Sequence, residues 1–278
     1  MVPKKFIYLN DAFVEEAQAS ILVSDLAIQR GYGIFDFFKT INSKPVFLQD
    51  HLERFYHSAA MMHLKILQTP VELENILTEL LKKNHIADAG VKILLTGGYS
   101  SDGYTQPEYP NLIIMQSPLK LSLKFDPAGM SLVTFNYQRQ LAEMKTLDYS
   151  MAIWLQPFIK ENNADDVLYQ YNGSVKEAPR ANFFIVTKEG EVVTAKTNVL
   201  AGVIRKNILK LENTGLKITE RDFTVEELHN AAEAFITSTT KHVFPVLQID
   251  GKPVGDGKAG KISEKLSVLL MEKISSQF

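Results

Sequence analysis

The sequence contains no cysteine among its 278 residues. Disulfide bonds, thiol nucleophiles and cysteine-ligated metals are therefore excluded. An excess of charge of either sign is also missing, because 30 Lys and Arg residues face 32 Asp and Glu residues and leave a net charge of -2. The basic residues are scattered along the chain and the sequence pI is about 6.3, so we expect no nucleic-acid partner.

Long apolar runs are absent as well. No uninterrupted apolar segment reaches the length that a membrane span requires, and residues 1–5 lack the apolar core of a signal peptide. We therefore expect no membrane partner and a cytoplasmic protein.

Three histidines, His51, His57 and His63, follow one another on a helix predicted over residues 50–65. Their regular spacing of six residues does not place them on one face of a helix, as shared metal ligands would require. We interpret them as solvent-exposed or capping residues and predict no metal site.

Hydrophobic residues make up 45% of the chain, enough for one large domain or two modest ones. The best boundary lies at residues 116–120, where Pro118 and polar residues separate two apolar segments. We predict an N-terminal α+β domain over residues 1–117 and a second domain over residues 118–278.

Apolar periodicity predicts a small sheet with two helices in the first domain. The expected strands cover residues 6–9, 12–14, 34–41, 46–48, 91–96 and 111–115. The expected helices cover residues 50–65 and 70–84, and Asp50 with Glu53 forms a capping box in the first. A polar, Tyr-rich loop over residues 97–110 is a candidate to line or cover a substrate site.

The second domain is expected to alternate strands with short helices. Its strands cover residues 131–135, 167–171, 182–186 and 234–237. A helix after Asp148 should be kinked or interrupted at Pro157, and Thr224 with Glu227 should cap a short helix. Asp250 and Gly251 turn a final hairpin before an amphipathic helix over residues 262–274.

Lys145 is the first candidate functional residue, because it lies between the apolar residues Met144 and Leu147. A lysine in this setting either extends its amine to water or holds it partly desolvated with a lowered pKa. Only the second kind does chemistry, and the local sequence leaves both readings open.

Glu177 is the second candidate. A strand ending at Tyr171, an Asn172-Gly173 turn and a return strand form a predicted hairpin that ends at this carboxylate. Pro179 interrupts the strand pattern two residues later, and the strand over residues 182–186 follows. A carboxylate held at the end of a sheet in this way needs a cationic partner.

Three segments offer groups that bind anions. Residues 197–205 form a turn that opens a helix running to about Leu211, and the first backbone amides of that helix are available to an anion. Residues 237–240 end a strand with hydroxyls and further amides. Arg54 lies one turn into the helix over residues 50–65. Each segment also has an ordinary structural explanation.

The ordered set resembles the fold-type IV, class IV aminotransferase family of pyridoxal phosphate enzymes. The family includes branched-chain and D-amino-acid aminotransferases and aminodeoxychorismate lyase. The resemblance covers most of the chain, and it rests on residues 30–36, 51–55, 145–149, 172–177 and 238–240 in that order and spacing.

The resemblance implies a fold and a set of roles. The fold would be α+β, with a small N-terminal α/β sandwich, a larger C-terminal β-barrel-like domain and pyridoxal 5′-phosphate in the cleft between them. Lys145 would form the Schiff base with the cofactor, and Glu177 would pair with the protonated pyridine nitrogen. The implied phosphate ligands are Arg54, the amides of Val203 and Ile204, and the residues Thr239 and Thr240. Relatives are homodimers, so a homodimer is expected.

Departures from the family pattern concern the phosphate and the substrate. Ile204 stands where the family usually has Thr, so one hydroxyl donor is missing and the phosphate should be held less tightly. Gly97 stands where many relatives have an arginine that binds substrate carboxylates. Arg180 is an additional cation after Glu177, and we take it as the candidate for the substrate carboxylate, with Arg30 as a second candidate.

The leading prediction is an aminotransferase that moves an amino group between an amino acid and a 2-oxo acid. The alternative is a pyruvate-releasing lyase that acts on aminodeoxychorismate. A third reading is a protein that binds pyridoxal phosphate without turnover. The sequence does not identify the substrate.

Overall fold

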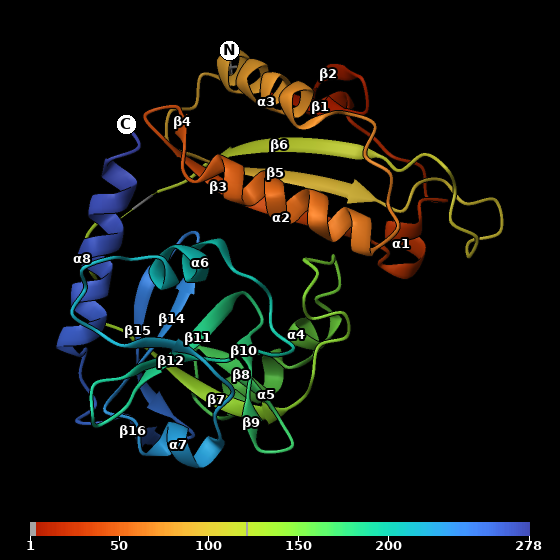
Figure 1. The fold of residues 1–278 in the computed structure, drawn as a ribbon. Helices are drawn as coiled ribbons and strands as arrows, with labels where there is room; N and C mark the ends of the chain where they lie inside the picture. The colour runs from red at the N-terminus through yellow and green to blue at the C-terminus, as the bar shows by residue number, and fades with distance from the viewer. Residues whose placement is uncertain (1–3, 121) are drawn as a thin grey trace. The chain divides into compact units, whose positions relative to one another are not determined.

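The computed structural model describes residues 4–120 and 122–278, which form two compact units (Figure 1). Unit 1 contains the described residues within Met1–Leu121 together with Met144–Asp148, and unit 2 contains those within Ser122–Glu143 and Tyr149–Phe278. The sequence predicted one boundary after residue 117. The return of residues 144–148 to unit 1 was not predicted.

Unit 1 is built on an antiparallel sheet, six-stranded within the described part of the chain, in the order β2-β1-β6-β5-β3-β4. The strands are β1 (Phe6–Leu9), β2 (Ala12–Glu15), β3 (Gly33–Ile41), β4 (Lys44–Pro45), β5 (Ala89–Thr96) and β6 (Leu112–Pro118). A 3-10 turn η1 (Glu16–Gln18) and a short helix α1 (Leu26–Arg30) precede β3.

Helices α2 (Leu48–Met61) and α3 (Pro70–Asn84) bury their apolar faces against one side of this sheet. Ile34 and Phe38 of β3 belong to the same core as Phe55 of α2 and Leu77 of α3. Alternation along β3 therefore directs its even-numbered residues toward the helices and Phe35 toward the opposite face.

The start of α2 differs from the prediction. The return strand is β4 at residues 44–45, two residues earlier than expected, because Phe47 adopts a left-handed conformation (φ 52°) and the helix begins at Leu48. Asp50 consequently lies in the first turn of α2, and the helix has no side-chain cap, so the predicted capping box at Asp50 and Glu53 is wrong. Thr69 and Glu72 form such a box on α3.

Unit 2 contains a second sheet, ten-stranded within the described residues, with the main order β13-β12-β11-β14-β15-β7-β8-β9. Its strands are β7 (Met130–Asn136), β8 (Asp166–Tyr171), β9 (Ser174–Val175), β10 (Glu177–Ala178), β11 (Ala181–Val186), β12 (Val192–Thr194), β13 (Ile218–Glu220), β14 (Glu233–Ser238), β15 (His242–Ile249) and β16 (Lys252–Pro253). The short strand β10 pairs with β11, and β16 pairs with β15.

The helices of unit 2 are α4 (Ser150–Trp154), α5 (Gln156–Glu161), α6 (Val203–Leu209), α7 (Val225–His229) and α8 (Lys261–Ser275). The predicted interruption at Pro157 is confirmed, because α4 ends and α5 begins around Leu155. The Asn172-Gly173 turn is confirmed as well, since both residues have positive φ values of 49° and 79°, as a primed turn requires. The return strand β9 ends at Val175, however, and Glu177, where we expected it to end, begins the separate strand β10.

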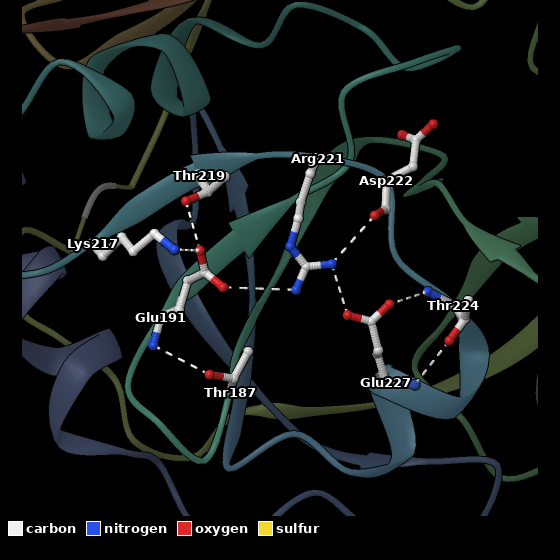
Figure 2. Close-up of polar contacts among 8 residues, drawn as sticks. All are labelled: Thr187, Glu191, Lys217, Thr219, Arg221, Asp222, Thr224 and Glu227. Atoms are coloured by element: carbon white, nitrogen blue, oxygen red, sulfur yellow. Dashed lines mark hydrogen bonds and ion pairs between the residues drawn. The ribbon is translucent and has the colours of Figure 1, made fainter.

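The edge of unit 2 at β12 and β13 carries a partly exposed set of charges that we call the Arg221 network (Figure 2). Arg221 contacts two carboxylates, with 2.7 Å from Nη1 to Oε1 of Glu227 and 3.8 Å from Nη2 to Oε2 of Glu191. Lys217 also binds Glu191, at 2.8 Å, and Thr224 with Glu227 forms the predicted capping box of α7. The network thus joins β12, β13 and α7 at the protein surface.

Candidate functional site

Lys145 lies beside the first residues of β3. The backbone N–H of Phe35 donates to the carbonyl of Lys145 at 2.9 Å, and the N–H of Lys145 donates to Oγ of Ser58 on α2 at 3.2 Å. The lysine side chain is half-buried, and its Nζ lies 4.4 Å from the centroid of the Phe35 ring. Residues 145–147 therefore extend the sheet of unit 1, and this pairing fixes where the amine emerges.

A buried ionic cluster lies one residue along β3 from Phe35, and we call it the Asp36 cluster. Both oxygens of the fully buried Asp36 carboxylate bind Arg54, with Nε and Nη2 each at 2.8 Å. Nδ1 of His51 lies 2.7 Å from Oδ1 of the same carboxylate. The strand and helix α2 together hold the Arg54 guanidinium in one orientation.

The pKa shifts in this cluster define its charges. Burial alone would raise the pKa of Asp36, but the positive Arg54 and the hydrogen bonds from His51 and Arg54 outweigh it and hold that pKa well below its usual range. Burial lowers the pKa of His51, and Arg54 and Lys145 act in the same direction. An ionised carboxylate only accepts, so the neutral His51 donates its Nδ1–H to Asp36.

His51 corrects one prediction from the sequence. We expected an exposed or capping histidine, and the structure buries His51 to 1% exposure against Asp36. His57 and His63 are exposed. Within residues 4–120 and 122–278, no group of three His, Asp or Glu side chains is placed to hold a metal ion.

Glu177 is the buried carboxylate of unit 2, with 4% of its surface exposed. Nε of Arg139 donates to its Oε1 at 3.0 Å, while the backbone N–H of Leu200 donates to Oε2 at 3.0 Å. Arg139 also donates from Nη2 to the carbonyl of Ala142 at 2.5 Å, which fixes the guanidinium. The cation that a buried carboxylate needs is therefore present, but we did not assign Arg139 from the sequence.

The helix α6 begins three residues beyond Leu200, with Gly202 at its N-cap position. No side chain caps this end of the helix, and the side chains of Val203 and Ile204 are buried with 3% exposure each. Their backbone amides are among those that have no partner within the helix. Helix α6 packs against β14, the strand that leads to Thr239 and Thr240 in the turn before β15.

Arg180 and Arg30, the candidates for the substrate carboxylate, have exposed side chains. The Arg180 side chain is 74% exposed and its Nη2 lies 3.4 Å from Oδ2 of Asp166. Arg30 ends α1 and donates from Nη1 to the carbonyl of Gln29 at 2.8 Å. Within its own unit, Arg180 therefore pairs with Asp166, and Arg30 with the backbone of Gln29.

The two units thus supply different chemistry. Unit 1 presents a primary amine at Lys145 and a guanidinium at Arg54. Unit 2 presents a buried carboxylate at Glu177 and an uncapped helix end at Gly202. The sequence analysis did not identify Asp36 and His51 as neighbours of Arg54, or Arg139 as the partner of Glu177, although the rule that buried charges need partners would have directed attention to the acid and the arginine.

Comparison with a family model shows a match over residues 33–249, and that family is described as Amino-transferase class IV. Lys145, Glu177, Arg54 and the start of α6 all fall inside the matched range. The match covers well over half of the chain.

Individual relatives agree with the family match. A D-alanine aminotransferase of Staphylococcus haemolyticus is 29% identical over 94% of this chain and 94% of its own. A D-alanine aminotransferase of Bacillus licheniformis is 28% identical over 98% of both chains. A solved branched-chain aminotransferase, from the thermophilic archaeon Thermoproteus uzoniensis with norvaline, has a TM-score of 0.88 at 21% identity, over 99% of this chain and 96% of that one.

Proposed function

Because the chain belongs to the class IV aminotransferase family, we propose that it transfers an amino group between an amino acid and a 2-oxo acid with pyridoxal 5′-phosphate as its cofactor. The family predicted from the sequence is confirmed, and the predicted fold type agrees with the solved structures it matches. The named relatives are aminotransferases, which supports transfer rather than the lyase reaction.

The residues present fit the proposed cofactor. Arg54 uses Nε and Nη2 on Asp36, and among the described residues its Nη1 has no hydrogen-bond partner and is not buried, so it suits a phosphate oxygen. The uncapped N-terminal end of α6 offers backbone amides that also suit a phosphate oxygen. Glu177 supplies the negative charge that a protonated ring nitrogen needs.

The geometric observation that carries the proposal is the position of Glu177. Its carboxylate is buried, yet Arg139 and the Leu200 amide stabilise the ionised form. When bound, the cofactor supplies an electron-withdrawing ring that labilises the proton on the substrate α-carbon. Glu177 would hold the ring nitrogen in its protonated form. The Lys145 amine would bind the cofactor and would move the proton of the substrate α-carbon.

The proposal also covers the substrates, the oligomeric state and the location of the protein. D-alanine and branched-chain amino acids are the first substrates to test, because these are the substrates in the names of the similar proteins. A homodimer, which the resemblance to the family implies, and a cytoplasmic location, which the sequence leads us to expect, both stay predictions. No helix among the described residues is long and apolar enough to cross a membrane.

Two measurements test the proposed function. Borohydride reduction of the cofactor-loaded protein should fix the cofactor on Lys145, which peptide mapping would locate. A single amino acid supplied without a 2-oxo acid should then convert the cofactor to pyridoxamine phosphate. Label on another lysine would overturn the role of Lys145. Release of pyruvate from aminodeoxychorismate, with no conversion by any D or L amino acid, would establish the lyase alternative instead.

Arg180 and Arg30 remain candidates for the substrate carboxylate, and the same half-reaction tests them. Arg180→Ala should raise the amino-acid concentration needed for half-maximal conversion without changing cofactor affinity. Since the Arg180 side chain faces solvent near Asp166, an unchanged concentration dependence would assign it to that surface pair instead.

A further inference from the structure

Asn182 connects the two parts of unit 2 that the proposed function uses. Strands β10 and β11 are antiparallel, and their register places Glu177 directly opposite Asn182. Side chains opposite one another in an antiparallel pair lie on the same face of the sheet. Nδ2 of Asn182 accordingly lies 3.2 Å from Oε2 of Glu177.

The same amide group also holds the backbone that leads to α6. Nδ2 of Asn182 donates to the carbonyl of Leu200 at 2.8 Å, and the N–H of Leu200 donates to Oε2 of Glu177 at 3.0 Å. Asn182 is 5% exposed, and both neighbours of its Nδ2 are acceptors, which fixes the orientation of the amide. Glu177, Asn182 and Leu200 therefore form a closed, buried ring of hydrogen bonds.

The oxygen of the Asn182 amide faces Gly202. A Cβ added to Gly202 would overlap Oδ1 of Asn182, while the φ angle of Gly202 is -64°, which any residue adopts. Glycine is thus required here by the Asn182 side chain and not by the backbone conformation. The Asn182 amide thus contacts the Glu177 carboxylate through Nδ2 and faces Gly202, the N-cap residue of α6, through Oδ1.

We propose that Asn182 is a positioning residue that fixes Glu177 and the α6 turn to one another, so that both ends of the cofactor meet groups already in place. This inference rests on the proposed function, in which Glu177 serves the ring nitrogen and the amides of Val203 and Ile204 serve the phosphate. The ring and its short phosphate arm allow little change in that separation. When the binding groups are already held in place, less free energy is lost in ordering them on binding, and the ligand binds more tightly.

The first test compares three probes on the apo-protein, namely pyridoxal 5′-phosphate, pyridoxal and inorganic phosphate. Asn182→Ala should weaken all three, and pyridoxal 5′-phosphate by about tenfold or more, since a hydrogen bond to a charged group is lost. Glu177→Gln keeps an oxygen that can accept from Asn182 and from the Leu200 amide but removes the negative charge, so it should weaken pyridoxal and leave inorganic phosphate unchanged. Dissociation constants from calorimetry or dialysis provide the readout, independent of turnover.

A matched control separates positioning from general stability. Asn84 in unit 1 bridges the backbone of Phe6 in a similar way, accepting from its N–H at 2.7 Å and donating to its carbonyl at 3.0 Å. Asn84→Ala should lower the unfolding temperature of the apo-protein without altering any of the three dissociation constants. Asn182→Ala should alter the constants even after its effect on unfolding is taken into account.

The second test uses the contact between Gly202 and Asn182, and its first variant leaves Asn182 itself unchanged. Gly202→Ala alone should weaken pyridoxal 5′-phosphate by about tenfold or more, because the new methyl group displaces the Asn182 amide. In an Asn182→Ala background the methyl group has room, so Gly202→Ala should add less than about threefold. Such non-additivity is the signature of a direct coupling.

The outcomes distinguish the two proposals. If the unaltered protein binds pyridoxal 5′-phosphate but Asn182→Ala changes only the pyridoxal constant, the coupling is refuted and the proposed function stands. Additive effects of Gly202→Ala and Asn182→Ala refute it in the same way. If the unaltered protein binds none of the three probes, the proposed function and the inference fail together.

Discussion

The Asp36 cluster and the Arg221 network use the same pair of chemical groups in opposite surroundings. Asp36 is fully buried, and its carboxylate binds one arginine through two nitrogens and one histidine. Arg221 binds Glu191 and Glu227 at the surface and Lys217 binds Glu191, and the Arg221 side chain is 36% exposed (Figure 2). Water and salt screen the second set and hardly reach the first.

The difference separates a structural role from a functional one. Surface ion pairs contribute about 0.2–1 kcal/mol each, so the Arg221 network joins β12, β13 and α7 without a large effect on the fold. A buried pair gives up the hydration of two ions, which amounts to several kcal/mol per ion before the attraction between them is counted. Placement of such a pair beside Lys145 is therefore better explained by the need for a fixed guanidinium than by stability.

The largest expected effect comes from breaking the buried side of this comparison. Asp36→Ala leaves the Arg54 charge without its partner and should lower the free energy of unfolding by about 3–5 kcal/mol. Glu227→Ala, the matched change in the Arg221 network, should lower it by about 1 kcal/mol, because a surface pair and a helix cap are lost. Urea unfolding of both variants measures the difference. Equal losses would contradict the distinction.

A buried charge with no partner sharpens the comparison further. Lys39 on β3 is fully buried, and its Nζ has no hydrogen-bond partner in the part of the chain that the structure describes. Burial lowers the pKa of Lys39 to about 7 from 10.5. Between these two values the unfolded chain binds more protons than the native protein, so stability rises with pH across that window.

Lys39→Met should therefore stabilise the protein most on the acidic side of this window. The gain should reach a few kcal/mol at pH 6, where the native protein must hold a buried ammonium, and shrink by pH 10, where the native amine is neutral and the unfolded amine, with its ordinary pKa of 10.5, begins to lose its proton as well. Unfolding in urea at the two pH values tests this. Lys92→Met on β5 is the control, since the Lys92 side chain is exposed and should show no such pH dependence. A gain that is the same at both pH values would refute the interpretation.

A smaller effect is expected at the proposed phosphate site. Ile204→Thr adds one hydroxyl to the turn, and a hydrogen bond to a charged group is worth about 1.5–3 kcal/mol. Cofactor affinity should rise by roughly tenfold or more, as measured by titration of the apo-protein. Val203→Thr, one residue earlier, is the matched variant and should give a smaller change. Equal affinities for the Ile204→Thr variant and the unaltered protein would show that the missing hydroxyl is already compensated.

The smallest effect belongs to the Arg221 network. Lys217 and Thr219 lower the pKa of Glu191 by hydrogen bonding to it, while burial would raise the pKa of Glu227 but is outweighed by hydrogen bonds from Thr224 and Arg221. Carboxylates with depressed pKa values stabilise the fold above their usual value of 4.5, and this contribution is lost as the pH falls below it. Arg221→Met should lose about 1 kcal/mol at pH 7 and almost nothing at pH 3. A loss of equal size at both pH values would point to packing of the arginine stem.

Local patterns predicted most of the elements but not the partnerships between them. The Asn172-Gly173 turn, the break at Pro157 and the cap at Thr224 follow from residue chemistry within a few positions, and all three are confirmed. The capping box at Asp50 failed because the left-handed Phe47 starts the helix two residues earlier than Asp50. A conformation of that kind in an aromatic residue has no signal in the sequence.

Long-range contacts explain what was missed in the candidate site. Arg139 and Glu177 are far apart in the chain and meet only because the sheet of unit 2 brings them together. His51 was interpreted as exposed because its partner Asp36 lies on a strand, and helical spacing says nothing about that strand. The roles of Lys145 and Glu177 came from resemblance to a family and stay predictions until the cofactor is located.

The return of residues 144–148 to unit 1 has a consequence for synthesis of the chain. Gly33 and Phe35 at the start of β3 receive their backbone partners from Lys145 and Leu147, which leave the ribosome long after the rest of that sheet. Until the first strand of unit 2 has been translated, the start of β3 therefore has a partner, β5, on one edge only. The lysine proposed for catalysis would then be among the last parts of its own unit to be put in place.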